Sequence, residues 1–98
     1  MKRVEFHPEA SAEFLAAATY YESQAHDLGH DFITLVERAV ARLQEFPDIG
    51  RPFGQRLRRI VVPRFPYGLV YRAEPDRIHV VAVMHLRRRP GYWRLRTS

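Results

Sequence analysis

The stretch from Tyr67 to Trp93, YGLVYRAEPDRIHVVAVMHLRRRPGYW, contains two apolar segments followed by a cationic, aromatic run. Residues 67–73 and 77–85 have the composition of β-strands, and Glu74-Pro75-Asp76 between them predicts the turn of a hairpin. In the second segment, His79, Val81 and Val83 alternate with Ile78, Val80, Ala82 and Met84. Apolar side chains on both faces are typical of a central strand that is covered, at least in part, on each side.

Two amphipathic helices are expected upstream of this hairpin. Pro8 suits a first helical position, and apolar residues at three- and four-residue spacings predict a helix over about 8–25. An apolar stripe from Leu28 to Phe46 predicts the second helix, with Asp27 or a neighbour as its cap. The alanines at 16–18 allow close packing, and the short link predicts an antiparallel helix hairpin.

Three shorter segments complete the predicted fold. Residues 2–7 and 57–62 have strand patterns, and 46–55 (FPDIGRPFGQ) reads as a turn that Arg51 is expected to hold in place. These elements predict an α+β domain with the helix hairpin on one face of a mostly antiparallel sheet that has three C-terminal strands. The helices can cover one face, so the other is expected to be partly open or covered by something else.

Length and composition predict a globular chain of one domain spanning residues 1–98. There is no run of about 18 apolar residues and no charged-then-apolar leader, so neither a membrane span nor a signal peptide is expected. The absence of cysteine excludes disulfides and cysteine chemistry, and it suits a cytoplasmic protein. His26 and His30 have a spacing that can bind metal, but no third ligand is near. We therefore expect no metal or cofactor.

The positive charge is concentrated in the second half of the chain. Residues 1–50 carry four basic and nine acidic side chains, whereas residues 51–98 carry twelve arginines against Glu74 and Asp76, a balance of +10. Arginine suits two-point binding of carboxylate or phosphate. A solubilising surface or arginine-rich codon usage is the alternative explanation. The size of the asymmetry favours a negatively charged partner.

The predicted elements follow one another as a strand, two helices and three strands. In this order, and in several of its residues, the chain resembles the RelE/ParE family of bacterial toxins from type II toxin–antitoxin systems. The likeness is greatest to the ParE-like, plasmid-stabilisation branch and spans nearly the whole chain. It is carried by the sum of three features: the turn Gly50-Arg51-Pro52, Phe65-Pro66-Tyr67 leading into Val70-Tyr71-Arg72, and His85 followed by Arg87-Arg88-Arg89-Pro90 and Tyr92-Trp93.

The resemblance implies a small toxin that a cognate antitoxin, encoded beside it, holds inactive. Characterised members of the ParE-like branch poison DNA gyrase, and the arginine-rich end is the implied target-binding part: Arg87, Arg88, Arg89, Tyr92 and Trp93. An acidic antitoxin segment would be attracted to the basic half, with Arg59 and Arg72 as expected contacts. Packing of Tyr92 and Trp93 against the core is an equally open interpretation, because aromatic side chains bury large areas.

The RelE-like branch provides an enzymatic alternative, because its members cleave messenger RNA in the ribosome. Cations on the sheet stabilise the phosphate transition state there, and a tyrosine or histidine near the C-terminus assists. The corresponding candidates in this chain are Arg59, His85, Arg88 and Tyr92. Gly68 and Val61 stand where that branch commonly has cations, so gyrase is the favoured target. A non-toxic basic module that holds nucleic acid or an acidic peptide is the third alternative.

Overall fold

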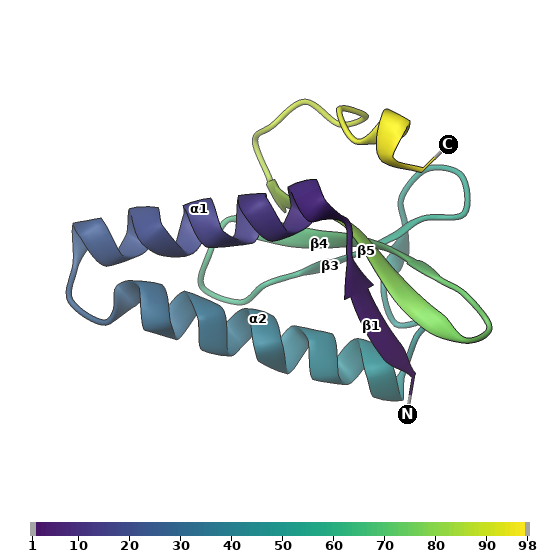
Figure 1. Cartoon of the computed structure of the whole chain (residues 1–98), viewed down its shortest axis with the longest axis horizontal. Coiled ribbons are helices and arrows are strands. Elements are labelled where there is room, and N and C mark those ends of the chain that lie inside the picture. Colours follow the sequence, from purple (N-terminus) through teal and green to yellow (C-terminus); the bar gives the residue numbers. More distant parts are fainter. Residues whose placement is uncertain (1, 98) are drawn as a thin grey trace.

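The structure, a computed structural model, describes residues 2–97 as two helices packed against one face of a five-stranded sheet (Figure 1). In chain order the elements are β1 (Arg3–Phe6), α1 (Pro8–Gln24), α2 (Leu28–Glu45), β2 (Arg51–Pro52), β3 (Arg58–Val61), β4 (Tyr67–Ala73), β5 (Arg77–His85) and the short 3-10 helix η1 (Arg94–Arg96). The sheet order is β1-β5-β4-β3-β2, with β1 parallel to β5 and the other neighbours antiparallel. The predicted α+β class, helix hairpin and mostly antiparallel sheet are confirmed.

Small residues bring α1 and α2 close together, as the alanine run predicted. A Cβ on Gly29 would stand 2.4 Å from the carbonyl oxygen of Ala18, so this approach requires glycine. Asp27 occupies the N-cap position of α2, in line with the prediction of Asp27 or a neighbour, but its side chain makes no capping hydrogen bond. The carboxylate of Glu22 instead accepts hydrogen bonds from the backbone N–H groups of Asp27 and Gly29, both at 3.0 Å.

Tyr71 connects β4 to the loop after α2. Its side chain is fully buried, its hydroxyl donates to the carbonyl oxygen of Pro47 at 2.8 Å, and it accepts from the Gly50 N–H at 2.9 Å. Arg58 also holds this loop, because its Nη1 donates to the carbonyl oxygen of Gly50 at 2.8 Å. Arg51 was expected to do so, but it is exposed and its side chain has no hydrogen bond or ion pair within residues 2–97.

A β-bulge in β5 builds the second apolar face of the sheet. The register passes from Val70 opposite Ala82 to Tyr71 opposite Val80, which leaves Val81 as the extra residue on β5. The strand lies inside the sheet, as predicted. The prediction that its side chains alternate between the two faces along its whole length was wrong, because the bulge shifts the alternation by one residue after Val80. The helix-side core contains Ile78, Val80 and Val83, and the opposite core contains Val81, Ala82 and Met84.

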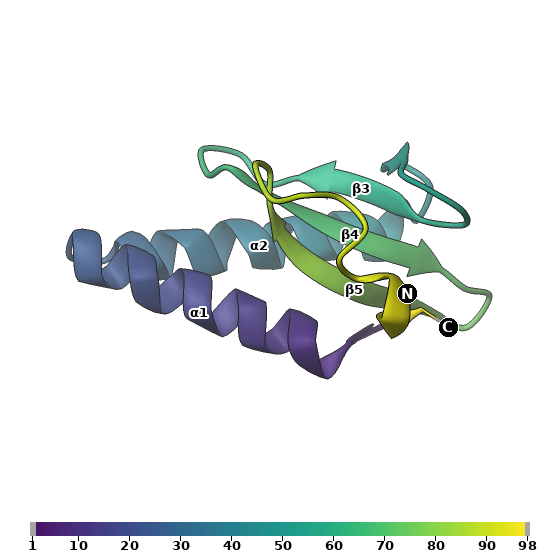
Figure 2. The ribbon, with the colours of Figure 1, turned by 90° about the horizontal axis from the view of Figure 1, so that it is seen from above.

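The chain itself covers part of the sheet face that lies away from the helices (Figure 2). Residues 86–97, here called the C-terminal segment, cross this face and bring Trp93 into the second core beside Leu57 and Met84. The expectation of a partly open face is therefore correct only in part. Val61, near one end of β3, is still 48% exposed. Within the described residues, neither helix has the length and apolarity needed to cross a bilayer.

Candidate functional site

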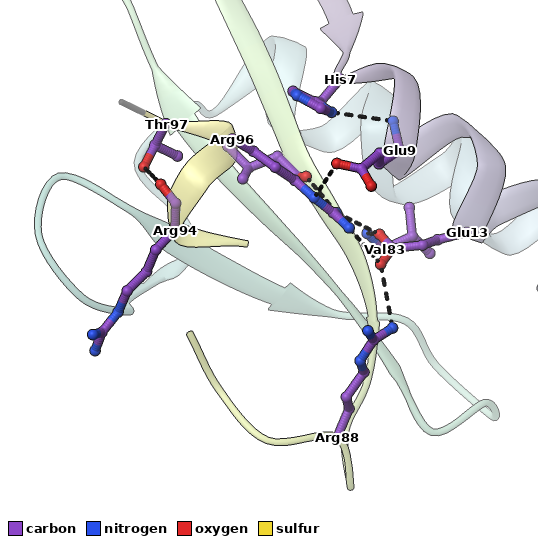
Figure 3. Close-up of polar contacts among 9 residues, drawn as sticks. His7, Glu9, Glu13, Val83, Arg88, Arg94, Arg96 and Thr97 are labelled. Atoms are coloured by element: carbon purple, nitrogen blue, oxygen red, sulfur yellow. Dashed lines mark hydrogen bonds and ion pairs between the residues drawn. The ribbon is translucent and has the colours of Figure 1, made fainter. Parts of the chain in front are cut away.

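Glu13 of α1 holds the C-terminal segment against the body of the protein (Figure 3). The guanidinium of Arg96 donates to both carboxylate oxygens of Glu13, at 2.9 and 3.2 Å. It also lies 3.4 Å from a carboxylate oxygen of Glu9. The side chains of Arg96 and Glu13 also form hydrogen bonds with the backbone of β5, at the part of its edge that β1 does not cover. Arg96 donates to the carbonyl oxygen of Val81 at 3.1 Å, and Glu13 accepts from the N–H of Val83 at 3.1 Å. The paired side chains thus take the place of a neighbouring strand.

The three consecutive arginines do not share one environment. The Arg88 side chain is 55% exposed, but its guanidinium carbon lies 3.7 Å from the ring centroid of Tyr92 and its Nη1 lies 3.6 Å from a Glu13 oxygen. Arg87 and Arg89 are exposed, and within residues 2–97 their side chains have no hydrogen bond, ion pair or ring contact. Arg87 and Arg89 are therefore the two members of the run whose side chains make no such contact among the described residues.

Tyr92 and Trp93 have internal packing roles. Trp93 is 5% exposed and stacks on Phe53, with ring centroids 5.3 Å apart. Tyr92 meets Trp93 edge to face at 5.2 Å, and its buried hydroxyl has no hydrogen-bond partner. Burial and, next, the nearby Glu13 carboxylate raise the pKa of Tyr92. This geometry supports the packing interpretation of both rings.

The residues predicted for RNA cleavage do not form one cationic cage. Arg59 places its guanidinium 4.6 Å from the ring centroid of Phe53, and among the described residues it has no hydrogen bond, ion pair or ring contact with the other three candidates. The stem of Arg59 also lies over Gly68, where an added Cβ would stand 3.1 Å from its Cγ and Cδ atoms. The space above Gly68 is thus filled by the aliphatic stem of Arg59, while its charged end lies over Phe53.

The two candidate proton-transfer groups are poorly arranged for accepting a proton. The Nδ1 of His85 accepts a hydrogen bond from the backbone N–H of Arg87 at 3.1 Å. A neutral His85 ring in this arrangement carries its proton on Nε2, which makes that nitrogen a donor. The raised pKa of Tyr92 disfavours the tyrosinate form that a general base requires.

Arg72, one of the two predicted antitoxin contacts, lies beside other polar groups that are incompletely satisfied. Its Nε is 3.5 Å from a Glu74 carboxylate oxygen, yet this buried nitrogen has no hydrogen bond. His79, the residue opposite Arg72 on β5, has a buried Nδ1 that also lacks a partner. Burial, followed by the charges of Arg77 and Arg72, lowers the pKa of His79.

A groove of about 1040 Å³, here called the basic groove, lies between the C-terminal segment and the turn that precedes β3. Three arginines contribute to its lining, and no lining residue is acidic: Phe53, Gly54, Gln55, Arg56, Leu57, Arg72, Pro90, Gly91, Trp93, Arg94 and Thr97. Sequence reasoning identified Arg72 but missed Arg56 and Arg94. These two arginines belong to separate irregular segments, and no sequence spacing indicates that they line one groove.

One exposed group of possible metal ligands lies at the link between the helices. Glu22, His26 and Asp27 offer ligand atoms within 4.8 Å of one another. Both carboxylate oxygens of Glu22 already accept backbone hydrogen bonds at the start of α2. We therefore assign no ion to this group, which contains His26 of the histidine pair considered in the sequence but not His30.

Comparison with known proteins places this geometry in a family. The family described as "ParE toxin of type II toxin-antitoxin system, parDE" matches residues 4–90, whereas no curated protein matches the chain. Among solved structures, the chromosomal ParDE TA system from P. aeruginosa is similar in fold, with a TM-score of 0.64 at 16% identity, covering 88% of this chain and 97% of that chain. Residues 91–97 of the C-terminal segment lie beyond the family match. Because the match spans most of the sequence, the chain belongs to the ParE toxin family of type II toxin–antitoxin systems.

Proposed function

We propose that this protein is a growth-inhibiting toxin that acts on DNA gyrase, or on the gyrase–DNA complex, and is neutralised by a cognate antitoxin. The supporting observation is that Arg87 and Arg89 are exposed and have no acidic partner in the part of the chain that the structure describes, residues 2–97. Trp93 is packed in the second core, and Arg88 contacts the ring of Tyr92. Guanidinium groups on a turn positioned in this way can bind phosphate or carboxylate with a smaller loss of conformational freedom.

The antitoxin would approach the same strongly basic half of the chain. Residues 51–98 carry a balance of +10, and long-range attraction to an acidic segment increases the rate of association. Arg59 and Arg72 remain our proposed antitoxin contacts on the sheet. In this proposal residues 1–98 act as one toxin domain in the cytoplasm. A plasmid that carries both genes would be stabilised because cells that lose it lose the antitoxin.

Ribosome-dependent cleavage of messenger RNA is the alternative function, and the geometry supports it less. Arg59 rests on Phe53, and position 68 provides no cation. The raised pKa of Tyr92 adds to the difficulty of proton abstraction. Our preference for gyrase rests on this incomplete cage together with the exposed pair Arg87 and Arg89.

The proposed target is tested by adding the purified protein to gyrase and relaxed plasmid and measuring supercoiling. We expect inhibition by the natural protein and a loss of potency of about a hundredfold or more in the Arg87→Gln/Arg89→Gln double variant, because two charge-assisted contacts of about 1.5–3 kcal/mol each are lost. The matched control is Arg38→Gln/Arg42→Gln, which removes the same charge from exposed positions on α2.

Three outcomes of this experiment are decisive. Normal supercoiling in the presence of folded natural protein contradicts the gyrase target. Equal loss of potency in both double variants would show a general charge effect and no special role for Arg87 and Arg89. Cleavage of translated messages in growth-arrested cells, with supercoiling unchanged, would favour the ribosomal alternative.

A further inference from the structure

We propose that His85 is a positioning residue, whose ring fixes the turn that presents Arg87 and Arg89 to the target. The ring acts through the backbone of the turn and does not itself contact the target. The consequence for target binding rests on the proposed function, whereas the effect of His85 on the turn can be measured on the protein alone.

The turn begins at His85, the last residue of β5, and its first three backbone N–H groups all have partners. Leu86 donates to the carbonyl oxygen of Pro66 at 2.8 Å, and Arg88 donates to that of His85 at 3.0 Å. The N–H of Arg87 donates to Nδ1 of the His85 ring at 3.1 Å. Two of these three hydrogen bonds connect backbone groups, and the third depends on one side chain.

The His85 ring is held in place by the sheet and the helices. Tyr67 lies opposite His85 on β4, and the two rings meet edge to face with their centroids 5.2 Å apart. The ring of Tyr67 lies 5.3 Å from that of Phe32 on α2 and 6.1 Å from that of Tyr21 on α1. Phe32 is fully buried. The orientation of the imidazole is therefore tied to the helix-side core, and so is the acceptor that it offers to the turn.

The hydrogen bond to His85 follows a pattern that asparagine and aspartate commonly form, in which a side-chain acceptor binds the backbone N–H two residues further along the chain. The Oδ1 atom of asparagine is as many bonds from the backbone as Nδ1 of histidine, whereas Oε1 of glutamine is one bond further away. His85→Asn can therefore keep the acceptor in place. His85→Gln and His85→Ala cannot.

Loss of this hydrogen bond should loosen the turn without unfolding the protein. The bond is exposed, so water can replace the ring as the partner of the Arg87 N–H. Arg87 and Arg89 keep their charges, but the turn then samples more conformations, and ordering it on the target costs free energy. The expected signature is weaker target binding at nearly unchanged stability.

The supercoiling assay compares the natural protein with His85→Asn, His85→Gln and His85→Ala. We expect the glutamine and alanine variants to lose potency by about three- to tenfold, because the target has to order the turn. His85→Asn should retain the potency of the natural protein. The matched control is His30→Ala, at an exposed position on α2, which should also retain it. Thermal unfolding checks that each variant is folded.

A second set of variants tests whether His85 acts through the two exposed arginines. When Arg87→Gln/Arg89→Gln already removes both charges, adding His85→Ala should lower potency by less than about twofold, because the turn no longer presents those charges. A further loss as large as that seen in the natural background would show that His85 acts elsewhere, and would overturn the inference.

Amide hydrogen exchange in the 15N-labelled protein tests the turn without gyrase. The Arg87 N–H should exchange at least about tenfold more slowly in the natural protein and in His85→Asn than in His85→Ala and His85→Gln. Nitrogen chemical shifts of the His85 ring should show an unprotonated Nδ1 and a protonated Nε2. If these results hold but the natural protein leaves supercoiling unchanged, the gyrase target fails and the role of His85 in the turn stands.

Three further results would contradict the role proposed for His85. Equal exchange rates of the Arg87 N–H in the natural protein and in His85→Ala would show that the ring does not hold the turn. Natural potency in His85→Ala would show that binding does not need the turn to be fixed. A loss of activity in His85→Asn equal to that in His85→Ala would assign the importance of the ring to Nε2, as expected for proton transfer in the ribosomal alternative.

Discussion

Arg96 and Glu13 are 83 residues apart in the chain and form a two-point charged hydrogen bond at 2.9 and 3.2 Å. Their side chains are only 9% and 15% exposed, and each also bonds to the backbone of β5. One carboxylate in the second turn of α1 therefore helps to hold the C-terminal segment, including one wall of the basic groove, together with the packing of Trp93 in the second core.

Replacing Glu13 with glutamine should destabilise the protein by about 1–3 kcal/mol, because the variant leaves the mostly buried guanidinium of Arg96 with only the exposed carboxylate of Glu9 as a charged partner. Urea denaturation followed by Trp93 fluorescence measures the free energy of unfolding. Glu37→Gln, at an exposed position on α2, should change it by less than about 0.5 kcal/mol. Equal denaturation midpoints for the two variants would contradict the role assigned to Glu13.

Tyr71→Phe should also reduce stability, by roughly 1–3 kcal/mol, because it leaves the N–H of Gly50 without its partner and removes the donor to Pro47. Tyr20→Phe is the control, since this side chain is 58% exposed and is expected to tolerate the change. The difference in unfolding free energy between the two variants is the measurement. A stable Tyr71→Phe protein would show that water replaces both bonds.

Trp93→Ala should cost about 3–5 kcal/mol, because it removes a large buried ring from the second core. The double variant Arg87→Ala/Arg89→Ala should unfold at nearly the same denaturant concentration as the natural protein. A stability loss confined to Trp93→Ala would support packing as the role of this ring. A fully stable Trp93→Ala protein that has lost activity would support target contact instead.

Stability should fall at acidic pH through the carboxylates that surround Arg77. Hydrogen bonds from Arg77 lower the pKa of Glu5 and of Glu74 below their ordinary value of 4.5. A carboxylate with a lowered pKa in the folded state contributes stability above its unfolded pKa, and that contribution is lost as pH falls through the folded pKa. Urea midpoints measured downward from neutral pH should therefore decline below about pH 4.5. Arg77→Gln should make this decline smaller, and parallel pH curves for the two proteins would refute the assignment.

Several features followed from local chemistry alone. The Pro8 start of α1, the apolar stripe of α2 and the turn at Glu74-Pro75-Asp76 each depend on neighbouring residues, and each appears in the structure. The two-residue strand β2 was missed because so short a segment has no periodic pattern. Asp27 was assigned the cap of α2 by residue type, but the bonding atoms come from Glu22, one turn back on the preceding helix.

The candidate site was harder to predict than the fold. The sequence showed that the arginines are concentrated after residue 50. Nothing in it distinguishes Arg87, Arg88 and Arg89, which were therefore predicted to act together. Arg88 differs from its neighbours because the turn directs it onto Tyr92 and toward Glu13. That difference depends on a residue some 75 positions earlier, which no local pattern reveals.

The order of residues was enough to establish the helices, the hairpin and the basic character of the second half, since these depend on periodicity, turn chemistry and charge count. Folding in three dimensions determined which arginines pair with acidic side chains and that the basic groove exists. It also placed Val81, the extra residue of the β5 bulge, in the second core. These properties arise from contacts between residues far apart in the chain, whose energies depend on distance and burial and not on spacing along the sequence.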